Sequence, residues 1–140
     1  MPEEAPRVWS IMPLVFCCSG IFLLSSFPGN AYPQVSWPLA DKVTHVGLYW
    51  MVGLASALCF VRRGYSGALA VGFGVFYGIS DELHQLFVPL RSCSLGDVVA
   101  DAIGAGAGVF SYYRLQSYLH RVRVKPVCTT SNAAESMELT

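Results

Sequence analysis

The side chains that could do chemistry are gathered in two parts of this sequence, residues 41–49 and 77–101. They offer carboxylates, imidazoles, phenols, an amide and two cations: Asp41, Lys42, His45, Tyr49, Tyr77, Asp81, Glu82, His84, Gln85, Arg91, Asp97 and Asp101. Apolar, glycine-rich segments flank the second group. A charged group in hydrocarbon costs on the order of several kcal/mol, so charges between such segments indicate a functional site. We expect these residues to bind the ligand of this protein.

The spacing of these residues predicts that they lie on helices. Three pairs are four residues apart: Asp41 and His45, Asp81 and Gln85, and Asp97 and Asp101. Residues with this spacing share one face of a helix. Tyr49 extends the first stripe by one turn, and Tyr77 extends the second. Glu82 is one position off the Asp81 face, which predicts that it faces lipid headgroups. Three helices would thus direct polar stripes into one site.

A metal site is one interpretation of this residue set. His45, His84 and the carboxylates would form a hard-to-borderline ligand set. The sequence has no HExxH or comparable motif. We therefore predict no metal, and the sequence leaves any cofactor unknown.

Acid/base chemistry without a metal is a second interpretation. The candidate catalytic residues are two imidazoles and two carboxylates: His45, His84, Asp81 and Asp101. Either imidazole could transfer a proton, and Arg91 and Lys42 could hold a phosphate or carboxylate. These residues alone leave open whether the protein is an enzyme.

Two further interpretations involve no reaction. The polar cluster could bind an anionic or amide-bearing ligand without converting it. Alternatively, its charges could neutralise one another and fix the register of the helices, because buried ion pairs by themselves indicate little beyond specificity.

The elements that must position these residues are apolar segments of the length that crosses a membrane. The chain has 140 residues, of which 54% are hydrophobic and 13% charged, whereas a soluble domain has roughly 25% charged residues. About 20 apolar residues span a bilayer. Four segments have this character, at about 9–27, 43–61, 65–85 and 95–113. The sequence predicts an all-α, integral membrane bundle of four transmembrane helices over residues 9–115.

Glycines predict where these helices pack closely. Gly74 and Gly78 form a GxxxG pair, and Gly104, Gly106 and Gly108 alternate with alanines. Small residues allow membrane helices to approach closely. Outside the bundle, we predict a short cytoplasmic lead at 1–8 and a basic, then polar, disordered cytoplasmic tail at 116–140.

Basic residues predict the orientation in the membrane. Seven of the nine lysines and arginines lie in the lead, the 62–64 loop and the C-terminal flank: Arg7, Arg62, Arg63, Arg114, Arg121, Arg123 and Lys125. Only Lys42 and Arg91 lie in the other two loops. Cytoplasmic loops carry the excess of positive charge. Both termini are therefore predicted in the cytoplasm, with the polar cluster at the outer face.

Three blocks of this sequence resemble the VanZ-like family, in that family's order and spacing. They are DKVTH at 41–45 with Tyr49, YGISDELHQ at 77–85 with Pro89 and Arg91, and DVVAD at 97–101 with Gly104. The resemblance covers about residues 40–110. It implies a small, multi-pass protein of the bacterial inner membrane. The namesake of that family is associated with low-level resistance to the glycopeptide teicoplanin.

Residues and resemblance together predict a membrane protein with an outward-facing polar site. We expect it to bind an outer-leaflet lipid or a cell-wall precursor and to modulate glycopeptide (teicoplanin) susceptibility. Its other expected partner is the lipid bilayer, and we expect no nucleic-acid partner. The alternative is a membrane-embedded enzyme that acts on a lipid-linked or phosphate-bearing envelope substrate, with His84 or His45 as acid/base.

Overall fold

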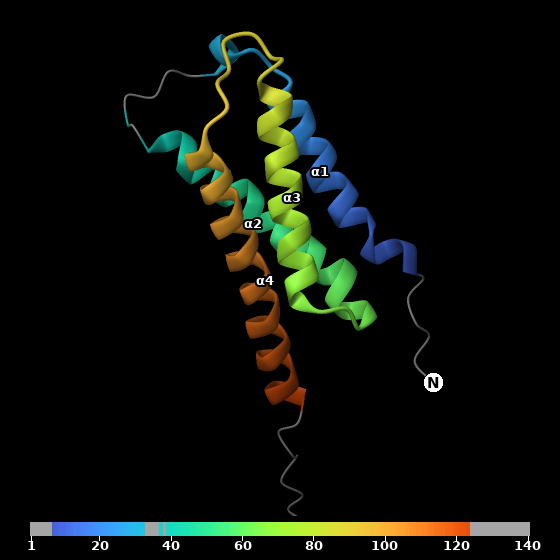
Figure 1. Cartoon of the computed structure of the whole chain (residues 1–140). Helices are drawn as coiled ribbons and strands as arrows, with labels where there is room; N and C mark the ends of the chain where they lie inside the picture. Colours follow the sequence, from blue (N-terminus) through green and yellow to red (C-terminus); the bar gives the residue numbers. More distant parts are fainter. Residues whose placement is uncertain (1–6, 33–36, 38, 124–140) are drawn as a thin grey trace, which may run out of the picture.

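The chain forms, in this computed structural model, a bundle of helices joined by short loops. The structure describes residues 7–32, 37 and 39–123. Those residues form helices and no strand, which confirms the predicted all-α class. In chain order the elements are η1 (Arg7–Ser10), α1 (Met12–Ser25), η2 (Gly29–Ala31), α2 (Ala40–Phe60), η3 (Val61–Arg63), α3 (Gly67–Gln85) and α4 (Leu95–Arg123), where η marks a 3-10 helix (Figure 1).

Helix α1 is shorter than the predicted segment at 9–27. It has 14 residues and carries Pro13 in its first turn. A proline is tolerated there because the first N–H groups of a helix have no intrahelical partner. The residues ahead of it form the separate turn η1, and Pro28, in extended backbone, follows the other end. The prediction of one long first helix is therefore wrong.

Helices α2 and α3 lie close to the predicted segments. Helix α2 starts at Ala40, three residues before the predicted start, and has Asp41 in its first turn, where the helix dipole favours a carboxylate. The turn after it ends at Gly64, whose φ of 86° suits glycine. Helix α3 is capped by Ser66, whose side chain accepts a hydrogen bond from the backbone N–H of Leu69.

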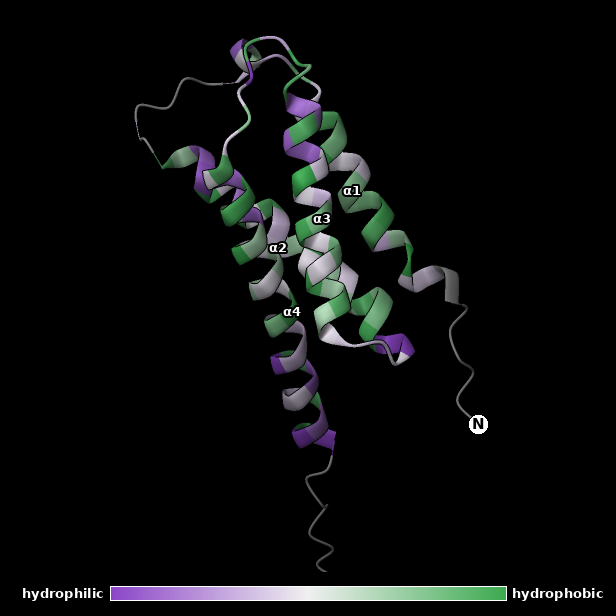
Figure 2. Cartoon of the chain, viewed as in Figure 1, coloured by the Kyte–Doolittle hydropathy of each residue, from purple (hydrophilic) through white to green (hydrophobic). Residues whose placement is uncertain are grey.

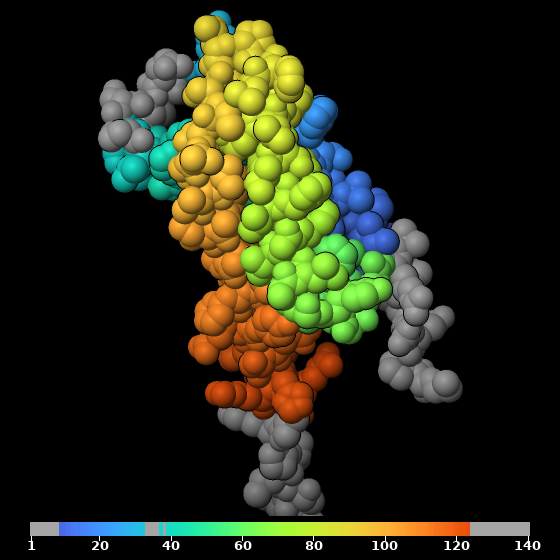
Figure 3. Space-filling model, viewed as in Figure 1, coloured from blue at the N-terminus to red at the C-terminus, as the bar shows by residue number. Residues whose placement is uncertain are grey.

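Helix α4 is longer than predicted. It runs to Arg123, so residues 116–123 are helical and not part of a disordered tail. The sequence has no glycine or proline between Gly108 and Pro126, and these are the residues that most often end a helix. Figure 3 shows the last turns of α4 projecting beyond the other helices. The prediction for residues 124–140 concerns a part of the chain outside the described residues.

Several of the predicted glycines bring the helix backbones together, whereas a Cβ at Gly106 would meet no atom within 4 Å. Helix α2 packs most extensively against α4. A Cβ added at Gly104 would lie 2.5 Å from the carbonyl oxygen of Val46. On α3, a Cβ at Gly74 would lie 2.6 Å from that of Ala105. Small residues thus let both α2 and α3 contact α4 at close range.

The surface of the bundle is strongly apolar. Large hydrophobic side chains are exposed on all four α-helices, among them Phe16, Trp50, Phe76 and Phe110. Of the described helices, the stretch Ala40–Arg63 is long and apolar enough to cross a membrane, and α1 is apolar but shorter. Figure 2 shows hydrophobic residues along the middle of the bundle and hydrophilic ones toward its two ends.

The polar site lies at one end of this bundle. The start of α2, the end of α3 and the start of α4 meet there, whereas η3 and both ends of the described chain lie toward the opposite end (Figure 1).

Candidate functional site

Five polar side chains from three helices are buried together at that end of the bundle. The exposed fractions of His45, Asp81, Glu82, Asp97 and Asp101 are 7%, 6%, 1%, 4% and 0%. Groups of this kind are almost never fully buried unless they are paired. Each of them comes from the terminal turns of α2, α3 or α4, so the predicted stripes meet where the three helices converge.

A hydrogen bond between His45 and Asp101 lies at the centre of this group. Nδ1 of His45 is 2.9 Å from Oδ1 of Asp101. When the Asp101 carboxylate is ionised it can only accept, and this ring nitrogen is then the donor. The Cβ of Asp101 and its Oδ2 lie beside Gly78, where a side chain would collide with them. Glycine at 78 therefore makes room for the carboxylate between α3 and α4.

Lys42 neutralises a second buried carboxylate. Its Nζ lies 2.7 Å from Oδ1 of Asp97, with 40% of the lysine side chain exposed and 6% of the aspartate side chain. A lysine buries its stem and keeps its charged end near solvent. The pair ties the first turn of α2 to the first turn of α4.

Glu82 does not face headgroups as its position on the helix suggested. It is buried, and its Oε2 accepts a hydrogen bond of 2.8 Å from the backbone N–H of Ser94, just before α4. Helix α3 lies between neighbours on two sides, so a residue one position away from Asp81 is covered as well. Asp81 itself accepts from Nε2 of Gln85 at 3.0 Å.

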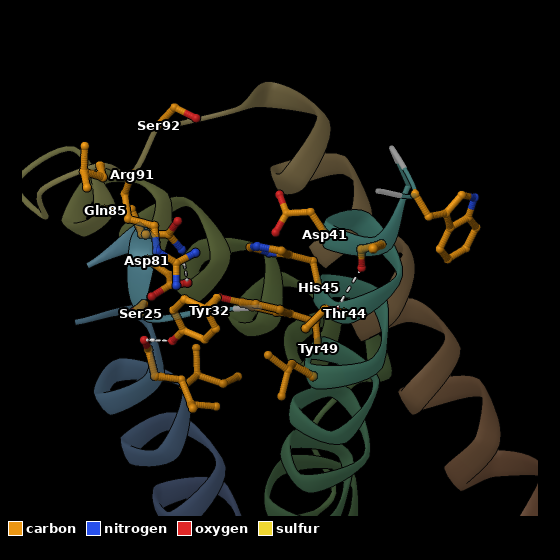
Figure 4. Close-up of a pocket in the computed structure, with 17 residues that line it drawn as sticks. Ser25, Tyr32, Asp41, Thr44, His45, Tyr49, Asp81, Gln85, Arg91 and Ser92 are labelled. Carbon is orange, nitrogen blue, oxygen red and sulfur yellow. Dashed lines mark hydrogen bonds between the residues drawn. The ribbon is translucent and has the colours of Figure 1, made fainter. Parts of the chain in front are cut away.

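A cavity of about 560 Å³ opens beside the buried group (Figure 4). Its polar lining comes from α1, α2, α3 and the loops that follow α1 and α3: Ser25, Tyr32, Asp41, Thr44, His45, Tyr49, Asp81, Gln85, Arg91 and Ser92. Its apolar lining includes Ile21, Leu24, Trp37, Leu48 and Leu90. His45 therefore belongs both to the buried group and to the cavity wall.

The loop after α3 holds Arg91 at the cavity. The guanidinium carbon of Arg91 lies 4.5 Å from the ring centre of Tyr32, a cation–π arrangement. The backbone N–H of Gly29 donates to the carbonyl of Pro89, and a Cβ at Gly29 would collide with the Leu90 carbonyl. This contact joins the loops after α1 and α3 around Arg91.

Two of the predicted site residues face α1 and lie outside the cavity lining. Nε2 of His84 is 3.1 Å from the hydroxyl of Ser26, and its ring stacks on Phe22 with centres 4.8 Å apart. The hydroxyl of Tyr77 donates to the carbonyl of Cys18 at 2.6 Å. Helical spacing could not reveal this, because it does not say which neighbour a face meets.

Four polar residues of the cavity were missed by the sequence reasoning. These are Ser25, Tyr32, Thr44 and Ser92. Two of them lie in the irregular segments that follow α1 and α3, which have no periodicity to analyse. Thr44 could have been found from the sequence, because it directly precedes His45 on the first turns of α2.

The family comparison supplies the identity of the chain. The sequence model of a family described as VanZ/LLP1 matches residues 10–116. The chain belongs to the VanZ/LLP1 family. An uncharacterised protein of Schizosaccharomyces pombe is 25% identical over 124 residues, which cover 85% of this chain and 75% of that protein. No solved structure matches the chain with significance.

Among the described residues of this VanZ/LLP1 protein, two groups of side chains have spacings suited to a metal ion. In each group, the ligand atoms of the three residues lie within 4.8 Å of one another. One group is Asp41, His45 and Asp97, of which Asp41 is exposed; the other is His45, Glu82 and Asp101, all buried. Imidazole and carboxylate are ligands of Zn²⁺ and Mn²⁺.

VanZ-like proteins are in general membrane-associated.

Proposed function

We propose that this protein crosses the membrane four times, with its cavity on the side away from the cytoplasm. The exposed apolar side chains on all four helices support this, because soluble monomers rarely expose large contiguous apolar patches. The first crossing uses η1 and α1 together, since the 14 residues of α1 alone cover only about 21 Å. The excess of basic residues at the opposite end supports the orientation.

Cys93 provides a test of this orientation. It is exposed in the loop before α4, and a variant that retains it as the single cysteine should react with an impermeant maleimide in intact cells. Desolvation and the nearby charge of Glu82 raise the pKa of this thiol. Because the thiolate is the reactive form, labelling is best measured near pH 8.5.

The matched control moves the cysteine to the other end of the bundle. Arg62, which is exposed there, is changed to cysteine in a chain that lacks all native cysteines. We expect this variant to react only after the cells are lysed. The reverse pattern for the two positions would place the cavity in the cytoplasm and reject the proposed orientation.

We infer that the cavity binds a phosphate-bearing lipid headgroup. The observation that carries this inference is the mixed lining of one cavity, which contains Arg91 and other polar side chains together with apolar ones such as Leu24 and Leu48. Ligand sites are typically apolar with a few placed polar groups. Arginine suits phosphate, while Asp41 and Asp81 can accept hydrogen bonds from hydroxyl or amine groups of the same headgroup.

The relative from a fission yeast supports a ligand that is not confined to bacterial walls. A phosphate next to an acyl or polyprenyl chain is chemistry that membrane lipids and lipid-linked wall precursors share. In a bacterial host, we propose that binding of such a precursor modulates susceptibility to teicoplanin.

Binding can be followed through the fluorescence of Trp37, which lines the cavity. A variant carrying Trp9→Phe and Trp50→Phe retains Trp37 as the single tryptophan and is titrated with dihexanoyl phosphatidic acid. In that background Arg91→Ala should weaken binding about 10-fold, which corresponds to ~1.4 kcal/mol, because a hydrogen bond to a charged phosphate is lost.

Arg62→Ala is the matched control, because it removes an arginine from the opposite end. It should leave the dissociation constant unchanged. In cells, expression of the unaltered chain and of Arg62→Ala should shift the inhibitory concentration of teicoplanin equally, and Arg91→Ala should not shift it. Equal lipid binding by both arginine variants, or a Trp37 signal that does not respond to the lipid, would refute the proposal.

A second candidate function is an enzyme that acts on the same class of ligand. The hydrogen bond of 2.9 Å between His45 and Asp101 favours it, since a carboxylate that orients an imidazole is a common acid/base arrangement. His45 is the better candidate base, because His84 contacts Ser26 and Phe22 instead of the cavity. Turnover of a phosphate ester that His45→Gln abolishes without changing the Trp37 titration would favour this function.

A further inference from the structure

We propose that His45, Glu82 and Asp101 bind one divalent metal cation. The three residues come from α2, α3 and α4, and their ligand atoms lie within 4.8 Å of one another. All three side chains are buried, with exposed fractions of 7%, 1% and 0%. This site shares His45 with the wall of the headgroup cavity, but it does not depend on the lipid proposed above.

Unpaired carboxylate oxygens are the main observation behind this site. Oε2 of Glu82 accepts from Ser94 and Oδ1 of Asp101 from His45. The second oxygen of each carboxylate, Oε1 of Glu82 and Oδ2 of Asp101, is buried without a hydrogen-bond partner. A buried acceptor without a partner is strongly unfavourable. A cation between the helices would give these oxygens the partner that the described side chains do not supply.

The charge of the buried group also calls for a cation. Asp81, Glu82, Asp97 and Asp101 are four buried carboxyl groups. Among the described residues, the ion pairs to them are those of Lys42 and His45. Because His45 must be neutral to coordinate a metal, four ionised carboxylates would face the single positive charge of Lys42. Buried charges are usually paired or coordinate metals, and one divalent cation would supply two of the three missing charges.

The donor set indicates the class of cation. One imidazole nitrogen and two carboxylates suit Zn²⁺ or Mn²⁺ better than Ca²⁺, which takes six to eight oxygen ligands. The overlapping group of Asp41, His45 and Asp97 is a weaker candidate. Its Asp41 is exposed, and its Asp97 already pairs with Lys42.

The test measures metal binding directly on the full chain purified in detergent. After treatment with EDTA and dialysis against Zn²⁺ or Mn²⁺, we expect about one equivalent of metal per chain by elemental analysis. The unfolding temperature should rise by about 5–10 °C at saturating metal, since a ligand of the folded state stabilises it. Substitution with Co²⁺ should produce visible absorption bands, a readout independent of stability.

Variants separate this site from the alternatives. Glu82→Gln keeps an oxygen that can accept from Ser94, so it should fold, but it should lose the bound metal, the temperature shift and the Co²⁺ bands. Asp41→Asn should retain the bound metal, the temperature shift and the Co²⁺ bands. Arg91→Ala should retain them as well, even if it loses headgroup binding. Loss of metal in Asp41→Asn with retention in Glu82→Gln would overturn the assignment. An unaltered chain that binds no metal, together with a Glu82→Gln variant of undiminished stability, would show that protons neutralise the group.

Discussion

Replacing Gly108 with leucine should destabilise the bundle by on the order of 3 kcal/mol or more, and folded protein should be recovered poorly. A Cβ at this position would collide with the carbonyl oxygen of Trp50 and lie 2.6 Å from the backbone nitrogen of Leu54. Overpacking a core usually costs about 1–3 kcal/mol, and here the colliding atoms are backbone of the most extensive helix pair. The measurement is the free energy of unfolding in mixed micelles titrated with SDS.

Gly106→Leu is the control, on the same helix. A Cβ at Gly106 would meet no atom within 4 Å. Both substitutions replace the poor helix former glycine with a good one, a gain of roughly 1 kcal/mol that is common to the two variants. The difference between them therefore isolates the α2–α4 contact. Equal stability of Gly106→Leu and Gly108→Leu would mean that the two helices do not pack at this distance.

The class and centres of the helices could be predicted from the sequence, because they depend on local properties. Apolar segments separated by charged or proline-containing turns indicated the four α-helices, and glycine spacing indicated where they pack. Helix ends depend on finer features. Pro13 shortens α1 to 14 residues, and the absence of glycine and proline after Gly108 extends α4 to Arg123.

The site was predictable to the extent that it follows helical spacing. The three pairs at i,i+4 lie on three helices that converge at one end of the bundle, so their polar stripes meet. Spacing within one helix does not determine which neighbour covers each face. For this reason the spacing did not reveal that His84 contacts Phe22 of α1, and the expectation that Glu82 faces headgroups was wrong, because Glu82 is buried.

Small and charged residues depend on one another in this bundle. Gly78 on α3 lies against the Asp101 carboxylate of α4, so a glycine of the predicted packing pair provides the space for a buried charge. His45 then links that charge to the cavity wall. Close helix packing and the polar site are therefore parts of one arrangement.

Breaking the His45–Asp101 pair should produce the second large effect. Asp101→Ala removes a fully buried carboxylate and leaves the imidazole nitrogen of His45 without the partner 2.9 Å away. Loss of one member of a buried pair typically costs about 3–5 kcal/mol, because the other member remains buried and unpaired. We expect this loss in the SDS-titrated free energy of unfolding, with EDTA present so that metal does not contribute.

A double substitution tests the reason for that loss. The double variant His45→Phe/Asp101→Leu replaces both members of the pair, so neither position retains a polar group that needs a partner. Apolar replacement of a whole buried pair is often neutral or stabilising. The double variant should therefore recover most of the stability that Asp101→Ala loses, while metal binding stays abolished. That result would separate the two roles of the pair, because the fold would tolerate its absence and the site would not. If the double variant is as unstable as Asp101→Ala, the pair holds α2 and α4 together, and its main role is structural.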